Sequence, residues 1–336
     1  MRRNDSIARF LARWLWLVLV AVGAAHADRT VRYTVQELSS LGGVGASARG
    51  INNRGDVVGT AILRGLPDIV QHAVLWTRDG VRDLGPNLGD TSLVSAINDH
   101  GFMVGDVGVQ PFLWSPNGTP TPLPFAGRVR TLNNHNTIAG SFFISGVFNF
   151  GQEHAMFFQD GVLHDLGFPP GYRQSAAAGV NGHGVVVGSG IPNFTSDNHA
   201  LIWQNGVVRD LGGLGGHNAF AGLINDRGDI VGTAETATGR LMLVRWHVEG
   251  GMEVLGERLS ALAMNERGDI VGNNLNTGKA FLLRDGTFTS LSDATESAGY
   301  TSFAPFAMND RGQVAGVAFK PGGSNFGVAL LLTPKD

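Results

Sequence analysis

The chain has 336 residues with 49 glycines, 43% hydrophobic residues, no cysteine and a formal net charge of −3 at pH 7. This charge, and the lack of any basic block, disfavours nucleic acid or an anionic membrane surface as the main partner, since both are bound through clustered Lys and Arg. Disulfides cannot contribute to stability, so packing and backbone hydrogen bonds must hold the fold together.

Residues 1–27 have the three parts of a secretory signal peptide. Four arginines precede or flank an apolar run from Trp14 to Ala25, and Ala25-His26-Ala27 forms an A-x-A site, so cleavage is expected after Ala27. A retained anchor is less favoured, because the run is shorter than the roughly 20 residues of a membrane-spanning helix. We expect a secreted or periplasmic bacterial protein, residues 28–336, that is monomeric and has no membrane span after cleavage.

One nine-residue phrase, of which INDRGDIVG from Ile224 is a typical copy, occurs seven times in the remainder of the chain. Aligned on its asparagine, the copies lie 46, 35, 48, 44, 40 and 44 residues apart, a spacing typical of four-stranded propeller blades. The aligned asparagines are Asn52, Asn98, Asn133, Asn181, Asn225, Asn265 and Asn309.

Each copy is followed by a second phrase and, in most copies, by a third. HAVLW at His72 and HALIW at His199 predict one strand, and endings such as VRDLG before Gly85 predict the next. The unit therefore reads as strand A up to the asparagine, a hairpin, strand B (VVG), a variable loop, strand C (HAxLW), a hairpin and strand D (VxDLG).

The two ends of the chain complement each other. The last unit stops after its C strand, GVALLLT, while YTVQELSSLGG (Tyr33 to Gly43) resembles a D strand that precedes the first A strand. We therefore predict an all-β, seven-bladed β-propeller with four-stranded blades, closed by the N-terminal strand, which completes the last blade. An open stack of the same units is the weaker alternative.

Turn chemistry explains the repeated asparagine and glycine. Asn is favoured where a type I turn begins, and Gly or, in the third copy, Asn136 tolerates the left-handed backbone that closes it. The histidines at His72, His154 and His199 are interpreted as packing and hydrogen-bonding elements between blades, and four tryptophans as core between blades. These four are Trp76, Trp114, Trp203 and Trp246.

The combination of HAF-type phrases (His-Ala-Val, His-Ala-Met, His-Ala-Leu, Lys-Ala-Phe) with I-N-x-x-G-x-V-V-G and D-L-G-x-L-G-G resembles the bacterial extracellular HAF-repeat family. The resemblance covers essentially all of residues 28–336. It implies an exported bacterial protein of propeller-like build and does not specify an activity.

The face of the ring opposite the repeated hairpins is the candidate binding surface, because it carries the long B-to-C and D-to-A loops. Six residues that break the repeat there form the candidate ligand-binding set: Arg128, Arg130, Tyr172, Arg173, His217 and Tyr300. Carboxylates on the same face could in principle support glycoside hydrolysis. They are Asp68, Asp90, Glu153, Asp197, Glu235 and Glu257.

Three functions remain open from the sequence. The leading hypothesis is a non-enzymatic exported scaffold that binds a glycan or protein through the loop face. The second is a polysaccharide lyase-like enzyme in which Arg stabilises an enolate and His or Tyr acts as base and acid. The third is a structural envelope or matrix component. No catalytic residue, metal site or cofactor is predicted.

Overall fold

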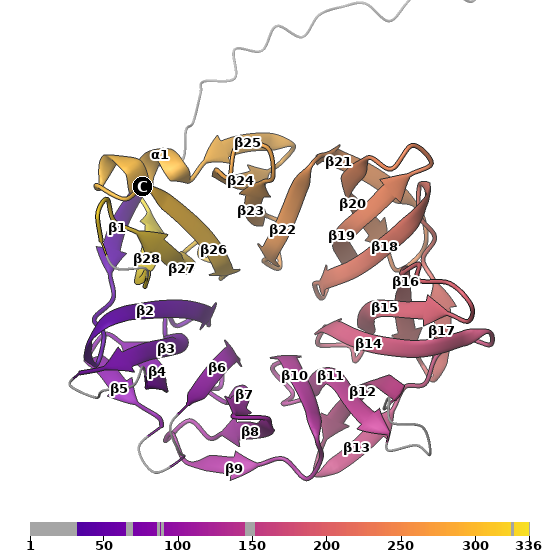
Figure 1. Cartoon of the computed structure of the whole chain (residues 1–336), viewed down its shortest axis with the longest axis horizontal. Coiled ribbons are helices and arrows are strands. Elements are labelled where there is room, and N and C mark those ends of the chain that lie inside the picture. The colour runs from indigo at the N-terminus through magenta and orange to yellow at the C-terminus, as the bar shows by residue number, and fades with distance from the viewer. Residues whose placement is uncertain are drawn as a thin grey trace, which may run out of the picture. The chain divides into compact units, whose positions relative to one another are not determined.

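Seven four-stranded antiparallel sheets surround a common axis in the computed structural model of the protein (Figure 1). The structure describes residues 32–64, 70–85, 88, 91–144, 152–323 and 326–335, and the predicted signal peptide lies outside them. Residues Arg32–Asp336 form one compact unit. The predicted seven-bladed β-propeller is confirmed.

The blades follow one another in chain order, each with strand A innermost (Figure 1). Blade 1 contains β2 (Gly42–Ile51), β3 (Val57–Leu63), β4 (Gln71–Thr77) and β5 (Gly80–Asp83). Blade 2 contains β6 (Ser92–Ile97), β7 (Met103–Val107), β8 (Gln110–Trp114) and β9 (Pro120–Pro122). Blade 3 contains β10 (Gly127–Leu132), β11 (Ile138–Ile144), β12 (Gln152–Gln159) and β13 (Val162–Asp165). Blade 4 contains β14 (Tyr172–Val180), β15 (Val186–Pro192), β16 (His199–Gln204) and β17 (Val207–Asp210).

The remaining blades include the junction of the two chain ends. Blade 5 contains β18 (Gly215–Ile224), β19 (Asp229–Thr236), β20 (Leu241–His247) and β21 (Met252–Glu257). Blade 6 contains β22 (Leu259–Met264), β23 (Ile270–Asn274), β24 (Ala280–Arg284) and β25 (Thr287–Ser290). Blade 7 contains β26 (Ser302–Met308), β27 (Val314–Phe319), β28 (Val328–Pro334) and β1 (Tyr33–Glu37).

Strand β1 closes the ring as predicted. It pairs antiparallel with β28 in a register that runs from Tyr33 opposite Pro334 to Glu37 opposite Leu330. The outer strand of blade 7 thus comes from the start of the chain and the other three strands from its end. The pairing satisfies the backbone hydrogen-bonding groups on the outer side of β28, which would otherwise form an exposed strand edge.

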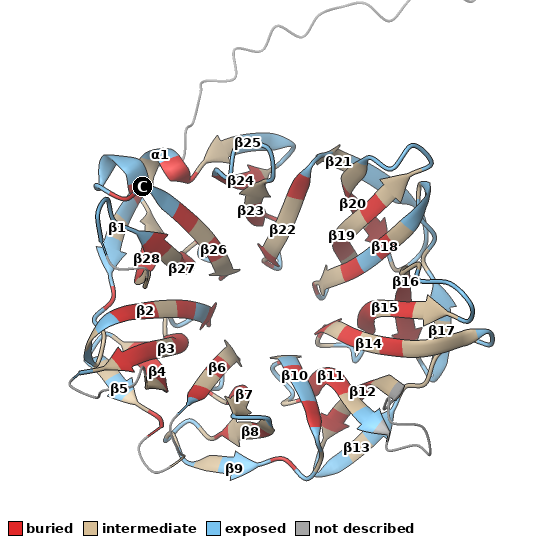
Figure 2. Ribbon diagram, viewed as in Figure 1, coloured by how far each residue is buried: buried red, intermediate tan, exposed pale blue. Residues whose placement is uncertain are grey.

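The core lies between the blades, where Figure 2 shows buried residues along the inner strands. Trp114 of blade 2 is fully buried against apolar residues of blade 1, including Val58 and Leu84. Its indole N–H donates to the backbone oxygen of Leu84, and Trp203 of blade 4 donates to Gly167 after blade 3 in the same way. The prediction that these tryptophans pack between blades is confirmed.

A short helix interrupts one connection that the sequence analysis treats as a loop. Helix α1 (Ser292–Ser297) lies between blades 6 and 7, and Thr295 and Ser292 are buried. Its Glu296 and Asp293 lie within 3.5 and 4.0 Å of Lys279, which replaces the repeated histidine in blade 6. The helix therefore supplies the acidic partner that this lysine needs.

Candidate functional site

The seven repeated asparagines organise the A-to-B hairpins. In blade 1 the Oδ1 atom of Asn52 accepts hydrogen bonds from the backbone N–H groups of Arg54 and Asp56, both at 3.0 Å. The backbone of Gly55, at φ 91°, donates to the carbonyl of Asn52. The predicted role of Asn and Gly in the turn is confirmed, and Asn136 occupies the left-handed position of the third copy with φ 61°.

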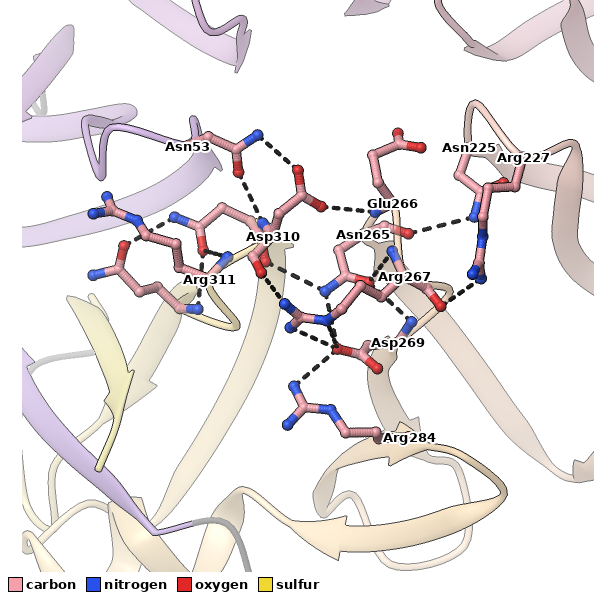
Figure 3. A network of polar contacts seen from close by, with 12 residues as sticks. Asn53, Asn225, Arg227, Asn265, Glu266, Arg267, Asp269, Arg284, Asp310 and Arg311 are labelled. Atoms are coloured by element: carbon pink, nitrogen blue, oxygen red, sulfur yellow. Dashed lines mark hydrogen bonds and ion pairs between the residues drawn. The ribbon is translucent and has the colours of Figure 1, made fainter. Parts of the chain in front are cut away.

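The same asparagines also join the blades, which the sequence analysis did not foresee. The Nδ2 group of each donates to the backbone oxygen of the asparagine in the next blade, and Asn309 donates to Asn52 to complete the circle. Figure 3 shows this contact between blades 5, 6 and 7. The other five links measure 3.0, 2.9, 3.1, 3.5 and 3.4 Å; they start at Asn98, Asn133, Asn181, Asn225 and Asn265, respectively.

A second circle runs through the residues that follow these asparagines. The backbone N–H of Glu266 donates to Asp310, and that of Asp310 donates to Asn53 (Figure 3). Gly182 occupies this position in blade 4 and has no side chain to accept a bond from Asn134. The polar groups of the A-to-B hairpins thus bond to one another. Among the described residues, the second circle lacks one hydrogen bond, the one between blades 3 and 4.

The repeated histidines pair within a blade, not between blades as predicted. His72 and Asp83, eleven residues later on the adjacent strand, approach to 2.9 Å through the imidazole Nδ1. The equivalent pairs of His154 and His199, with Asp165 and Asp210, are 3.0 and 2.7 Å apart. Strands C and D are antiparallel neighbours, so a spacing of eleven across a short hairpin brings these residues together. The contact between blades is made instead by serines such as Ser92, which accepts from the Ala73 N–H.

Two of the six candidate ligand-binding residues hold the B-to-C loop of blade 4, Asn193–Asn198, which we call the rim loop. Arg173 donates to the backbone oxygen of Thr195 at 3.2 Å. On the other side, His217 of blade 5 lies 3.3 Å from the carboxylate of Asp197, and its side chain is 83% exposed. Backbone bonds from Asn193 to Gly171 and from Ala219 to Asn198 fasten the two ends of the loop.

Phe194 lies in this rim loop and is the functional candidate that the sequence analysis missed. Its side chain is fully exposed, at 104% of the reference area, and its backbone has φ 64°. A bulky residue in the left-handed region costs of order 1–3 kcal/mol and is found where the surrounding structure enforces it. A large apolar residue within the polar stretch PNFTSDN is the sequence signal that could have indicated Phe194.

The candidate tyrosines donate hydrogen bonds to carboxylates. The Tyr172 hydroxyl lies 3.0 Å from Asp210 and 2.8 Å from the Nδ1 atom of His199. Burial, together with Asp210, raises the pKa of Tyr172. Tyr300 donates to Glu37 at 2.9 Å, and burial and Glu37 raise its pKa to about 12. Both hydroxyls are therefore protonated near neutral pH.

Arg128 and Arg130 lie on β10, the inner strand of blade 3, and both are exposed. Asp106 on β7 of blade 2 faces them: burial raises its pKa to about 6, although both arginines oppose this shift. Within the described residues no hydrogen bond or ion pair joins any two of the six candidate residues, which occupy blades 3, 4, 5 and 7.

The candidate carboxylates are each engaged separately. Glu153 accepts from Ser141 at 2.5 Å, Glu235 accepts from Asn218 at 3.0 Å, and Glu257 pairs with Arg240. Asp68 and Asp90 lie outside the described residues. Among the residues that the structure describes, no group of three or more His, Asp or Glu is placed to hold a metal ion, and no helix is long and apolar enough to cross a membrane.

The fold and these sites define the class of protein as a β-propeller, and comparison with known proteins extends no further than the fold. No protein-family model and no curated protein matches the chain. A streptogramin B lyase is similar in structure, with a TM-score of 0.57, 13% identity, and coverage of 90% of this chain and 98% of that chain. A catalytically inactive virginiamycin B lyase from Staphylococcus aureus with quinupristin gives 0.54, 12%, 90% and 99%. The β-propeller domain of the trilobed protease from Pyrococcus furiosus gives 0.55, 10%, 87% and 98%.

Proposed function

We propose that the protein is an exported, non-enzymatic scaffold of the HAF-repeat type that binds a glycan through its loop face. The observation that carries the proposal is Phe194, fully exposed on a loop that is fastened at both ends. A rigid scaffold that presents a variable loop is the usual arrangement of a binding site. Strain at an exposed aromatic residue contributes nothing to packing, so it points toward a role in binding.

The surroundings of Phe194 suit a sugar. An aromatic ring offers an apolar face for the C–H side of a pyranose ring, while nearby polar groups bind its hydroxyls. Asp197 and His217 lie at one side of the rim loop, and Asn218 links it to Glu235. Exposed apolar residues also occur in the B-to-C turn of blade 2 (Val109) and at the ends of the B strands of blades 3 and 7 (Phe143 and Phe319), which extends the surface along the same face.

The lyase-like alternative receives less support from this geometry. A general base must lose its proton near the working pH, and the raised pKa values of Tyr172 and Tyr300 make both unsuitable. The arginines that would stabilise an enolate lie in blades 3 and 4, and Tyr300 lies in blade 7. The likeness to lyase structures at 12–13% identity supports the shared fold alone.

The test is binding of neutral and acidic polysaccharides, measured by calorimetry, to the wild-type protein and to Phe194→Ala. We expect at least one polysaccharide to bind and the substitution to weaken it at least about tenfold, since an aromatic contact and its buried area are lost. Val207→Ala, at an exposed position (65%) beside the C-to-D hairpin of blade 4 and so on the opposite face, is the matched control.

Two results would contradict the proposal. Binding that is equally strong in Phe194→Ala would place the site elsewhere on the molecule. Absence of polysaccharide binding, combined with a protein partner whose capture depends on Phe194, would show that the ligand is a protein and not a glycan.

A further inference from the structure

Every inner strand contains a β-bulge at the same place, three residues before the repeated asparagine. In blade 3, for example, the pairing of β10 with β11 shifts between Val129 and Thr131, which leaves Arg130 without a partner. The same shift occurs in the other six blades. A bulge re-aims the side chain of its extra residue, and bulges are frequent beside binding sites.

The extra residues face the axis of the ring. An inner strand is paired with strand B on its outer side, and its free edge borders the axis of the ring (Figure 1). We infer that exposed side chains at the bulges lie beside this axis. Ala48 and Val129, which precede the extra residue, are buried, whereas Arg49 and Arg130 themselves are exposed. The seven bulges therefore place six side chains and one glycine, Gly222, around the axis.

The side chains on blades 1 to 3 are cationic or polar. The bulge residues there are Arg49, Ser95 and Arg130, and Arg128 lies two residues before Arg130 on the same strand. Within the described residues none of these three arginines has a carboxylate within ion-pair distance, whereas six other arginines do, among them Arg54, Arg240 and Arg267. These guanidinium groups lie on β2 and β10, the inner strands on either side of β6. Guanidinium groups without a carboxylate partner favour an anion, because each can bind carboxylate or phosphate oxygens in pairs.

The side chains on blades 4 to 7 are apolar or absent. The bulge residues there are Ala178, Gly222, Leu262 and Phe306. The Arg49 guanidinium lies over the Phe306 ring, 4.4 Å from its centroid, so the cationic and apolar parts are in direct contact where blade 7 meets blade 1. A ligand that lies against both parts needs an anionic group and an apolar body.

We propose that the inner strands form an axial binding site for a small organic anion. Its carboxylate or phosphate group contacts Arg49 and Arg130, with Arg128 adding positive charge, and its apolar part lies against Phe306 and Leu262. The site is distinct from the rim loop and does not depend on glycan binding there. Arg49 was not singled out in the sequence, although it occupies the same repeat position as Arg130.

The negative charge of Asp106 disfavours binding of an anion at this site, and this provides a second test of the proposal. Its carboxylate is close enough to Arg130 and Arg128 to interact with both charges. Neutralising it removes repulsion toward the bound anion without removing any group that holds the anion. Substitutions of the arginines and of Asp106 should therefore change affinity in opposite directions.

The experiment is calorimetric titration at pH 7.5 with benzoate and phenyl phosphate, and with benzyl alcohol as the uncharged analogue. We expect both anions to bind, benzyl alcohol to bind at least about tenfold more weakly, and Arg49→Gln and Arg130→Gln each to weaken the anions at least about tenfold. Asp106→Asn should tighten them. The relative response to benzoate and phenyl phosphate identifies which anionic group the site prefers.

Arg64→Gln, at an exposed position after β3 and away from the axis, is the matched control and should leave binding unchanged. Thermal melts of all variants check folding, which the substitutions of the exposed arginines should preserve and which Asp106→Asn should not weaken. The proposal is overturned if neither anion binds up to about 10 mM, a free energy near −3 kcal/mol, or if the arginine variants bind as tightly as wild type. Equal binding of benzyl alcohol would also overturn it, since the site would then be apolar only.

Discussion

Asp106 shows how its position in the repeat can shift the pKa of a single side chain. The corresponding positions in other blades are uncharged, for example Thr60 and Ser189, each directly after the glycine of strand B. Asp106 is half-buried there, and burial raises its pKa from 3.8 to about 6 despite Arg130 and Arg128. A carboxylate that is hard to ionise in the folded state reduces stability at neutral pH.

The sign of the effect follows from linkage. The folded protein binds the Asp106 proton more tightly than the unfolded chain, so this residue favours folding below about pH 4, and the contribution is lost as the pH rises through about 6. Asp106→Asn should therefore increase the free energy of unfolding at pH 7.5, by about 1–2 kcal/mol once solvent screening is allowed for. Urea unfolding between pH 4 and 7.5 measures it. Asp79→Asn, at an exposed hairpin position, should show no such gain, and an equal gain in both variants would refute the assignment.

For individual residues, the sequence predicts local contacts and does not predict contacts between blades. The Oδ1 contacts of Asn52 are local, so turn propensity predicts them. Its Nδ2 contact joins it to Asn98, 46 residues away, and depends on how two blades lie side by side. Phe194 was missed because exposure and backbone strain are not visible in a sequence, and Tyr300 was grouped with Arg130 because sequence does not give distances across a ring.

At the scale of the element, the A-to-B hairpin reverses the chain and also joins neighbouring blades by hydrogen bonds. Its asparagine links backbones, the following residue supplies a second link, and arginines such as Arg54 and Arg267 bond to the backbone of the next hairpin. Repetition made strands and hairpins predictable, because seven independent copies agreed on one alternation of strand and turn. The bulge was not predictable in this way, since its extra residue follows no common residue type and ranges from Gly222 to Arg130 and Phe306.

The missing link at Gly182 gives a prediction about this element. Gly182→Asn should supply the acceptor for the Asn134 N–H and stabilise the protein by about 1 kcal/mol, from one hydrogen bond and a stiffer unfolded chain. The new Cβ would lie 2.8 Å from an oxygen of Asp226, whose carboxylate must therefore shift while it still accepts from the backbone N–H of residue 182. Thermal unfolding compares Gly182→Asn with Gly182→Ala, which adds the Cβ without the amide. If the alanine variant is equally stable, the second circle of bonds contributes nothing at this junction.

At the scale of the whole molecule, closure of the ring is the property that the ends of the chain determine. The last unit lacks a D strand, and the N-terminal segment resembles a D strand without a unit of its own, so the sequence predicted closure. The pairing of β1 with β28 confirms this prediction. Both proposed binding surfaces require a closed ring, because the rim loop is held by two neighbouring blades and the axial site is built from inner strands of several blades.

Removal of residues 28–40 tests this closure. Blade 7 would lose its outer strand together with the buried side chains of Tyr33 and Leu38, and β28 would become an exposed edge. Burial of these two side chains alone is worth about 3 kcal/mol or more, so the melting temperature should fall clearly. A truncation that begins at Arg32 keeps β1 and is the control. Because Arg49 contacts Phe306 across the same junction, the longer deletion should also weaken anion binding, and a deletion that leaves both stability and anion affinity unchanged would show that β1 does not close the ring.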